Sequence, residues 1–323
     1  MDIDKSNYLG VLEEFPEQCR NACKFAQGVK LSNDADKIIV AGMGGSSIGG
    51  DLLKIFMKDS QIPVFTVRDY TLPKFVNNKT LVIVVSYSGN TEETLSCYEE
   101  AISKGAQILA ITSGGILAQK AKNVIRIPGG MQPRSAIAYL FFPMLMALNN
   151  SGILSISQND IDEMASILND KKTFHSTGKK IASKLKGKIP LIYSSSLFAP
   201  VAYRWKTQIN ENSKWPAFTH SFPELNHNEL VSYKLMKKKD FATIYIKDKD
   251  DHERVKKRMD ITSKLTSKNT NLIEVTSIGN SLLARVFYTI YIGDFVSYYL
   301  ALLNKQDPTP VDVIENLKKK LSE

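Results

Sequence analysis

The sequence is poor in cysteine and histidine. Among its 323 residues it has three cysteines, Cys19, Cys23 and Cys97, and four histidines. The cysteines are odd in number and lack CxxC spacing, so the pattern argues against a disulfide framework or a zinc site and favours a reducing compartment. So few histidines also leave a short list of side chains that titrate near neutral pH.

Long hydrophobic runs are absent too. No uninterrupted apolar run reaches the length of a membrane span. The first residues, Met1-Asp-Ile-Asp-Lys-Ser-Asn-Tyr8, have neither the basic segment nor the apolar core of a signal peptide. We therefore expect a cytoplasmic protein without a membrane partner.

Two common nucleotide-binding patterns are missing. GxxxxGK[ST] does not occur, which excludes a P-loop NTPase. A glycine-rich turn, Gly42-Met-Gly-Gly-Ser-Ser47, follows the first predicted strand, but Ser47 stands where the third glycine of the dinucleotide fingerprint belongs. Because glycine lets the backbone approach a ligand closely, we expect this turn to form a ligand contact surface instead.

The chain carries more basic than acidic residues, with 42 Lys and Arg against 33 Asp and Glu. Lysine clusters of this kind can mark nucleic-acid binding. Here they are spread along the chain without interleaved aromatic residues, so we expect a solvated basic surface and no nucleic-acid partner. The excess positive charge can also attract an anionic substrate.

The first half alternates predicted strands and helices. After an expected helix over 7–29, apolar segments typical of buried strands occur at 37–41, 64–68, 81–85, 108–112 and 124–127, with helical segments between them. Strands that are apolar throughout and separated by helices indicate a parallel, doubly wound sheet of about five strands.

The second half repeats this rhythm. Residues 151–188 are polar and largely helical, with Gly178 and Gly187 as expected breaks, and further strands are expected at 189–193, 241–246 and 271–275. A long apolar helix over 281–303 and a final helix over 311–321 follow. We therefore predict an α/β protein with two doubly wound domains, at 1–150 and 179–323, joined by a helical connection at 151–178.

The stretch Leu81–Leu95 gives the strongest functional signal. Its buried strand leads into Ser86, Ser88 and Thr91, directly before a helix. Free N–H groups at a helix start, the helix dipole and these hydroxyls together favour a bound phosphate. The alternative is an ordinary helix cap formed by Ser88 or Thr91, although a cap uses only one hydroxyl.

Two of these motifs resemble the sugar isomerase (SIS) domain: Gly44-Gly45-Ser46 after the first strand and Ser86-Tyr-Ser-Gly-Asn-Thr91 after the third. Later segments narrow the resemblance, from about Lys37 to the end, to the bifunctional phosphoglucose/phosphomannose isomerases: Pro133-Arg-Ser-Ala136, Asn210-Glu-Asn-Ser-Lys-Trp-Pro216, Pro223-Glu-Leu-Asn-His-Asn-Glu229 and Asp307-Pro-Thr-Pro-Val311.

The resemblance implies two SIS domains and an enzyme that interconverts glucose 6-phosphate and mannose 6-phosphate with fructose 6-phosphate through a cis-enediolate. It implies no metal and no cofactor. The residues that it implies for holding the phosphate are Gly45, Ser46, Ser86, Ser88 and Thr91. One departure from the family pattern is Ser47, where glycine is common, and its hydroxymethyl group can crowd or assist the ligand.

Such a reaction needs a group that opens the sugar ring, and a side chain that titrates near neutrality suits this step. His227 is the natural candidate and His220 is its rival, while His175 and His252 lie in polar, lysine-rich helices typical of a surface. The resemblance favours His227 and adds Lys305 as a second ring-opening residue.

Proton transfer between C2 and C1 needs a carboxylate in a partly desolvated site. Glu211, Glu224 and Glu229 compete for this role, and the resemblance places the base at Glu211. Glu224 lies three residues before His227, a spacing found in metal sites, but it stands alone, so we expect it to orient the loop.

The enediolate oxygens need a cationic partner, and Arg134 is the best candidate because a guanidinium keeps its charge and offers a fixed fork of donors. The alternative role for this arginine is capping a helix or pairing with a carboxylate. Ser297, on the long apolar helix, is a guess for a residue near the C2 hydroxyl.

The resemblance implies a homodimer in which His227 reaches the site of the neighbouring subunit. Three other functions remain as alternatives. A non-catalytic phosphosugar-binding regulator needs an effector domain, an amidotransferase-type SIS module needs a nucleophilic cysteine near the N-terminus, and a basic nucleic-acid binder predicts salt-dependent retention on DNA.

Overall fold

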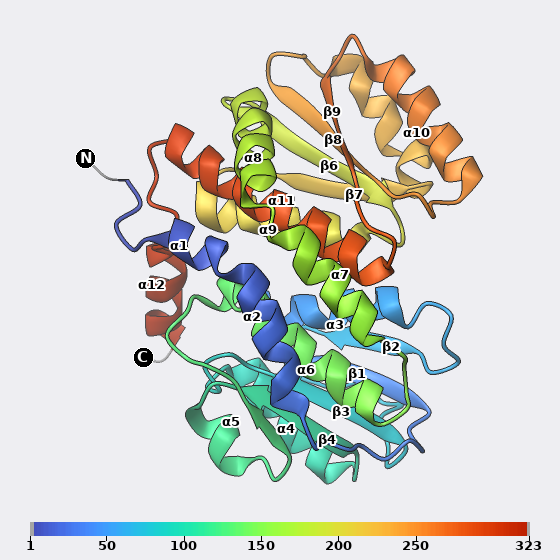
Figure 1. The fold of residues 1–323 in the computed structure, drawn as a ribbon, viewed down its shortest axis with the longest axis vertical. Helices are drawn as coiled ribbons and strands as arrows, with labels where there is room; N and C mark the ends of the chain where they lie inside the picture. Colours follow the sequence, from blue (N-terminus) through green and yellow to red (C-terminus); the bar gives the residue numbers. More distant parts are fainter. Residues whose placement is uncertain (1–2, 322–323) are drawn as a thin grey trace. The chain divides into compact units, whose positions relative to one another are not determined.

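The computed structural model describes residues 3–321. They form two compact units: the first unit comprises residues 14–165, and the second unit comprises residues 3–13 and 166–321. Each unit contains one fully parallel β-sheet with helices on both faces (Figure 1). The predicted α/β class with two doubly wound sheets is confirmed.

The sheet of the first unit has five strands in the order β2-β1-β3-β4-β5. The central strand β3 is buried along its whole length, which explains its uninterrupted apolar sequence. The strand bounds are β1 (Lys37–Ala41), β2 (Val64–Val67), β3 (Thr80–Val85), β4 (Gln107–Thr112) and β5 (Val124–Arg126).

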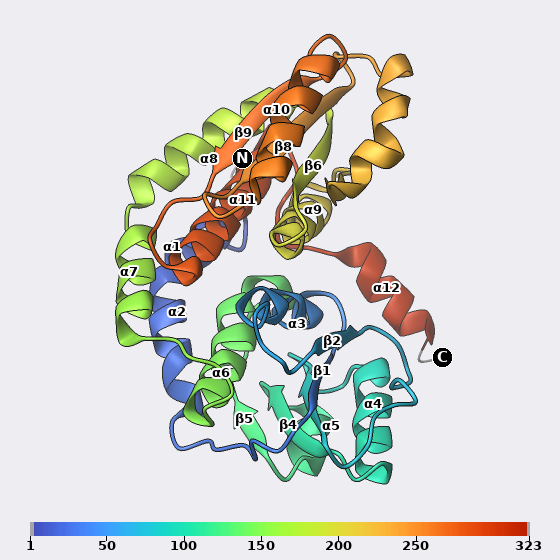
Figure 2. The ribbon, with the colours of Figure 1, turned by 90° about the vertical axis from the view of Figure 1, so that its right-hand side faces the viewer.

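Helices cover both faces of this sheet (Figure 2). Side chains at alternate positions of β1 and β3, such as Ile39 and Val82, share one core cluster with Cys97 and Tyr98 of α4 and Leu117 of α5. α3 and α6 pack against each other. The helices of this unit are α2 (Phe15–Ala22), η1 (Cys23–Ala26), α3 (Gly45–Phe56), α4 (Glu92–Ser103), α5 (Gly115–Lys120), η2 (Pro133–Ser135), α6 (Ile137–Asn150) and the start of α7 (Gln158–Leu168).

The sheet of the second unit has four strands in the order β7-β6-β8-β9. Its strand bounds are β6 (Ile189–Ser195), β7 (Phe218–Phe222), β8 (Phe241–Lys247) and β9 (Asn271–Thr276). Its helices are α1 (Tyr8–Glu13), α8 (Lys171–Leu185), α9 (Ala199–Ser213), η3 (Glu224–His227), η4 (Glu229–Leu235), α10 (Glu253–Thr266), α11 (Leu282–Leu303) and α12 (Asp312–Leu321).

The core of the second unit is built around α11, which packs against α8 and α9. Among the described residues, α11 alone is long and apolar enough to cross a membrane by length and composition. Arg285 and Asp294 interrupt its sequence, so it does not appear as an uninterrupted apolar run. Its most apolar window is 89% buried inside the protein. Its hydrophobicity is therefore that of a core helix.

The single helix predicted over 7–29 is wrong, because the chain forms α1, α2 and η1 there. Pro16 explains the break, since proline has no N–H and its ring clashes with the carbonyl four residues earlier. That carbonyl, on Leu12, instead accepts a hydrogen bond of 2.7 Å from the hydroxyl of Tyr291.

In the second half one expectation fails and one strand was not foreseen. α8 runs through Gly178 without a break, and a Cβ there would lie 2.7 Å from the Cβ of Phe295, so this glycine allows two helices to approach closely. The edge strand β7 is not expected from the sequence. Its residues are mostly polar and Phe218 is exposed, so the apolar signal of a buried strand is missing.

Candidate active site

The loop after β1 turns sharply at Gly44, whose φ of 51° lies in the left-handed region that favours glycine. α3 begins at the next residue, Gly45. A Cβ on Gly45 would lie 2.9 Å from the carbonyl oxygen of Pro133 and 3.0 Å from the nitrogen of Arg134. The start of α3 therefore touches the backbone that carries the predicted enediolate partner, and no side chain fits between them.

The loop after β3 contains three of the predicted phosphate ligands. Ser86 is buried; its hydroxyl donates to Thr91 Oγ1 at 3.0 Å and accepts from the N–H of Gly89 at 3.0 Å. Ser88 is exposed and accepts from the N–H of Asn90 at 3.3 Å. Thr91 occupies the N-cap position of α4, but its side chain makes no capping hydrogen bond. The capping alternative is therefore not observed for Thr91.

Hydrogen bonds join these two loops. The hydroxyl of Ser46 accepts from the N–H of Tyr87 at 3.2 Å. The hydroxyl of Tyr87 in turn donates to the carbonyl of Pro128 and accepts from the N–H of Met131, both at 3.0 Å. The loop after β3 (the serine loop) therefore hydrogen-bonds both to the loop after β1 (the glycine loop) and to the segment that leads to Arg134.

This position is the topological switch point of the sheet. With the order β2-β1-β3, the chain leaves β1 toward one edge and returns on its other side as β3. Ligands of open α/β sheets bind outside the carboxyl ends of the strands at such a point. Two helix N-termini, of α3 and α4, begin at these loops, which suits an anion.

Ser47, the departure from the family pattern, is fully buried beside this loop. Its hydroxyl donates to the carbonyl of Gly44 at 2.9 Å and accepts from Nε of Arg68 at 2.8 Å. Arg68 also pairs with Asp51. Burial would raise the pKa of Asp51, but the charge and hydrogen bonds of Arg68 and Lys54 outweigh it and lower that pKa. Ser47 therefore supports the turn.

Arg134 lies on the short helix η2 and is 3% exposed. Its Nη1 donates to Oε1 of Gln132 at 3.3 Å. The structure thus brings the five predicted phosphate ligands and Arg134 together within the first unit. The serine loop hydrogen-bonds to the glycine loop, and the glycine loop lies against the backbone of Pro133 and Arg134. The roles of the ligands and of Arg134 stay predictions.

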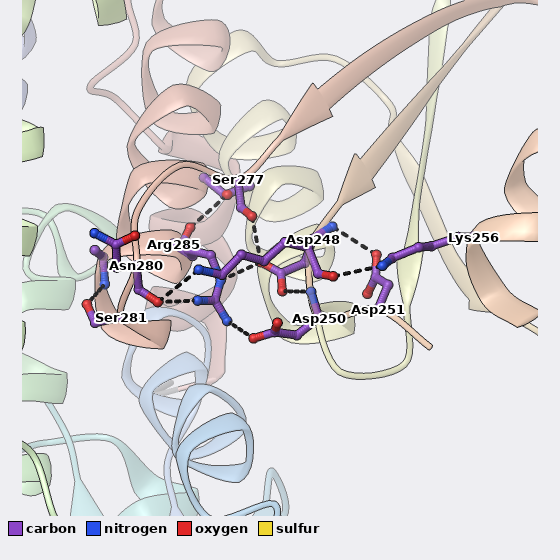
Figure 3. A network of polar contacts seen from close by, with 11 residues as sticks. Asp248, Asp250, Asp251, Lys256, Ser277, Asn280, Ser281 and Arg285 are labelled. Atoms are coloured by element: carbon purple, nitrogen blue, oxygen red, sulfur yellow. Dashed lines mark hydrogen bonds and ion pairs between the residues drawn. The ribbon is translucent and has the colours of Figure 1, made fainter. Parts of the chain in front are cut away.

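The second unit has the same switch-point topology but a different loop there (Figure 3). Asp248 follows β8, and its buried carboxylate accepts from Nε of Arg285 at 2.9 Å, from the hydroxyl of Ser277 at 2.5 Å and from the N–H of Asp250 at 3.0 Å. Because a carboxylate of the chain already takes these donors, this loop does not offer a phosphate the cradle found in the first unit.

The remaining predicted catalytic residues all lie in the second unit. Glu211 is half-buried near the end of α9. That end is held by Lys214, whose ammonium donates to the carbonyls of Glu211 at 2.7 Å and of Pro308 at 3.0 Å. The competing carboxylates have structural partners: Glu224 accepts from Asn228 at 2.8 Å, and Glu229 accepts from the hydroxyl of Tyr193.

His227 ends η3 and is exposed, and no side-chain hydrogen bond or ion pair of it exists within residues 3–321. The other three histidines are engaged. His175 contacts the hydroxyl of Tyr299 at 2.5 Å, while Nδ1 of His220 and of His252 accept backbone N–H bonds at 2.8 and 3.1 Å. This difference favours His227 over its rival His220 as a group available to a substrate.

Lys305 follows the last turn of α11 with a φ of 57°. Its N–H bonds to the carbonyl of Leu302 at 3.0 Å, and the N–H of Gln306 bonds to that of Ala301 at 3.0 Å. This is a Schellman motif, in which glycine usually occupies the left-handed position. A lysine there is strained, and such strain often occurs at functional residues. No feature of the sequence indicates this conformation.

The position of Ser297 contradicts the expectation that it lies near the C2 hydroxyl of a bound sugar. Its side chain is fully buried, donates to the carbonyl of Asp294 at 2.7 Å and accepts from Nδ2 of Asn212 at 2.9 Å. The same amide nitrogen contacts the hydroxyl of Tyr8 at 2.9 Å. Ser297 therefore joins α9 to α11 inside the core, where a substrate does not reach.

No group of three or more His, Cys, Asp or Glu side chains suited to a metal ion occurs in the described part of the chain. None of the three cysteines, all within the described residues, forms a disulfide bond. Burial raises the pKa of Cys23 to about 12, so its thiol stays protonated at neutral pH.

Comparisons with known proteins place the chain in a family. Residues 31–152 match the SIS domain, and residues 174–321 match the bacterial phospho-glucose isomerase C-terminal SIS domain. A bifunctional phosphoglucose/phosphomannose isomerase from Caldicellulosiruptor bescii is 44% identical over 95% of this chain and 97% of its own length. A D-glucosamine-6-phosphate 4-epimerase from Sulfolobus acidocaldarius is 37% identical over 68% of this chain and 70% of its own.

Among solved structures, the C-terminal domain of glucosamine-fructose-6-phosphate aminotransferase from Francisella tularensis superposes with a TM-score of 0.72 at 17% identity, over 96% of this chain and 100% of that domain. At this identity the likeness concerns the fold alone. The full-length sequence similarity carries the family assignment. The chain belongs to the family of the bifunctional phosphoglucose/phosphomannose isomerases.

Proposed function

We propose that this protein interconverts glucose 6-phosphate and mannose 6-phosphate with fructose 6-phosphate. The observation that carries the proposal is the 44% identity, over nearly the whole of both chains, to a relative of that name. The joined glycine and serine loops at the switch point of the first unit support it, because they suit the phosphate that all three sugars share.

In this proposal the phosphate lies against the loops that follow β1 and β3. Backbone N–H groups at the starts of α3 and α4 donate to its oxygens, and the serine and threonine hydroxyls complete the shell. The ligands proposed for the phosphate are Gly45, Ser46, Ser86, Ser88 and Thr91. These residues bind and orient the sugar and take no part in bond making.

The chemistry is proposed in three steps. His227 and Lys305 open the ring by moving a proton between the ring oxygen and the hydroxyl at the anomeric carbon. Glu211 then takes the proton from C2 of the open aldose and returns it to C1, while a proton moves between the two oxygens. Arg134 stabilises the negative charge that develops on those oxygens in the cis-enediolate.

Both C2 epimers fit this scheme. Glucose 6-phosphate and mannose 6-phosphate give the same enediolate, because C2 becomes planar in it. A rotation about C2–C3 of the open chain lets one base reach the hydrogen of either epimer. The scheme uses no metal and no redox cofactor.

The proposal includes a homodimer, in which His227 serves the site of a second copy, and a cytoplasmic location without a nucleic-acid or membrane partner. The exposure of His227 and its lack of side-chain bonds within residues 3–321 support this use of the histidine. If it holds, activity per chain falls when the protein is diluted to monomers. Full activity in a demonstrated monomer would refute it.

A second candidate is epimerisation at C4 of glucosamine 6-phosphate, which the 37% identical epimerase favours. A third is a regulator that binds a phosphosugar without converting it. The three differ in product, so a single set of assays separates them.

The test is a coupled assay of the purified protein with EDTA present. Glucose 6-phosphate and mannose 6-phosphate are supplied separately and fructose 6-phosphate is followed, while glucosamine 6-phosphate is assayed for its C4 epimer. Formation of fructose 6-phosphate from both aldoses supports the proposal. C4 epimerisation alone supports the second candidate, and phosphosugar binding without any product supports the regulator.

A further inference from the structure

Ser47 connects a charged side chain to the glycine loop. Ser47 and Asp51 are one helical turn apart on α3, so both side chains lie on the same side of that helix. Arg68 directly follows β2 and contacts both of them: its Nε donates to the hydroxyl of Ser47 at 2.8 Å, and its Nη2 pairs with Asp51. The two contacts fix the guanidinium with its Nε toward Ser47.

The chemistry of the three groups sets the direction of their hydrogen bonds. A guanidinium has donors and no acceptor, so the hydroxyl of Ser47 accepts from Arg68. A hydroxyl has a single hydrogen, and Ser47 donates it to the carbonyl oxygen of Gly44 at 2.9 Å. The donors therefore point in one direction, from Arg68 through Ser47 to the carbonyl of Gly44.

The last acceptor belongs to a peptide group of the proposed phosphate site. The carbonyl of Gly44 and the N–H of Gly45 are parts of one planar, conjugated peptide unit. A hydrogen bond donated to that carbonyl polarises the unit, so the N–H becomes a stronger donor. Gly45 begins α3 and is one of the ligands proposed for the phosphate. Gly44 is exposed and Gly45 half-buried, so a ligand can reach this peptide while Ser47 stays buried.

We propose that Arg68 and Ser47 form a relay that strengthens the binding of the phosphate group of a sugar phosphate. The positive charge of Arg68 acts on the phosphate through the hydroxyl of Ser47 and the N–H of Gly45. Neither side chain has to touch the ligand, so both are positioning residues. The relay rests on the phosphate site of the proposed function and adds two residues to its five ligands, but it does not depend on the isomerisation chemistry.

The simpler alternative is a purely structural hydroxyl. Serine side chains in helices often bond to a carbonyl three or four residues earlier. Ser103 does so in the last turn of α4, at the end away from the serine loop, where its hydroxyl donates to the carbonyl of Glu100 at 2.8 Å. Ser47 makes the same kind of bond and also accepts from a guanidinium. Ser103→Ala is therefore the matched control for Ser47→Ala.

The first test measures binding of glucose 6-phosphate and of inorganic phosphate by calorimetry. Ser47→Ala removes the relay and leaves the pair of Arg68 and Asp51 in place. Strengthening by roughly 10–30% per bond, applied to a charge-assisted hydrogen bond, predicts a Kd about two- to fivefold higher for both probes. Ser103→Ala should bind both as the wild type does. A Ser47→Ala protein with a lower Tm and an unchanged Kd would show a structural role and overturn the relay.

A double-mutant cycle separates the relay from a direct electrostatic effect of Arg68. Arg68→Met removes the donor and the charge, while Asp51 keeps an ion pair with Lys54 at 3.1 Å, so the variant should fold. If Arg68 acts through Ser47, Arg68→Met should raise Kd about twofold or more in the wild-type background and have no further effect in the Ser47→Ala background. Equal losses in the two backgrounds would overturn the relay, because the charge would then act without Ser47.

Steady-state kinetics distinguish the relay from the proposed activity. In a protein that forms fructose 6-phosphate, Ser47→Ala should raise KM by the factor found for Kd and leave kcat unchanged, because the phosphate takes no part in bond making. A lower kcat at constant KM would overturn the relay. If the wild type binds glucose 6-phosphate without converting it, the proposed activity fails and the Kd values alone decide on the relay. A wild type that binds neither probe would overturn the phosphate site and the relay with it.

Discussion

Replacing Lys305 by glycine should make the protein more stable and inactive at once. The residue has a φ of 57° at the left-handed position of a Schellman motif. A side chain at this left-handed φ destabilises the folded state by roughly 1–2 kcal/mol. Glycine relieves that strain, but it raises the conformational entropy of the unfolded chain, which destabilises the fold by about 0.4–1 kcal/mol. The net gain is about 0.5–1 kcal/mol, which for a unit of this size raises Tm by roughly 1–4 °C.

The same change removes the ammonium group that we assign to ring opening. General acid–base catalysis contributes on the order of 10²–10⁴ to a rate, so kcat for glucose 6-phosphate should fall by at least about 100-fold. Thermal unfolding and the coupled isomerase assay measure the two effects on one preparation.

Two controls separate strain from side-chain function. Lys305→Ala keeps a Cβ in the left-handed region, so it should lose activity without gaining stability. Lys214→Gly relieves a similar positive φ, of 52°, but loses the ammonium bonds to the carbonyls of Glu211 and Pro308, so it should not be stabilised. An active Lys305→Gly, or one that is clearly destabilised, would refute the reasoning.

Three other predictions follow from the site. Gly45→Ala should raise KM at least tenfold because its Cβ would lie 2.9 Å from a backbone carbonyl oxygen, whereas Gly114→Ala, which has free space, should not. His227→Ala should lower kcat by about 100-fold or more; an equal loss in His220→Ala would contradict the choice between the two histidines. Because the pKa of Asp51 is lowered, its charged form stabilises the fold above about pH 4, and this stability is lost as the pH falls through that lowered pKa. Asp51→Asn should therefore be less stable at pH 7, a difference that shrinks below about pH 4; a constant difference would contradict the assignment.

The sequence predicts what depends on local pattern. The buried strand ending at Val85 and the hydroxyl run after it are visible as an apolar run followed by polar residues, and both sheets were expected from such runs. The closeness of Gly45 to Arg134 depends on how distant segments pack, so only the structure gives it. The burial of Ser297 could not be predicted for the same reason, since an apolar helix does not reveal which of its faces meets a neighbour.

The backbone conformation at Lys305 could not be predicted from the sequence either. Lysine seldom adopts positive φ, so no propensity marks Lys305, and it stands out only once its dihedral angle is known. The break between α1 and α2 is the opposite case, because Pro16 could have predicted it: proline is disfavoured inside a helix. The apolar spacing across 7–29 outweighed this signal.

The most direct test of the central claim is to follow mannose 6-phosphate in ²H₂O by NMR with the purified protein. The account predicts that fructose 6-phosphate and then glucose 6-phosphate appear, carrying deuterium at C1 of the ketose and C2 of the aldose, because the transferred proton exchanges with solvent on Glu211. No conversion, or conversion without any deuterium at these carbons, would contradict an enediolate isomerase.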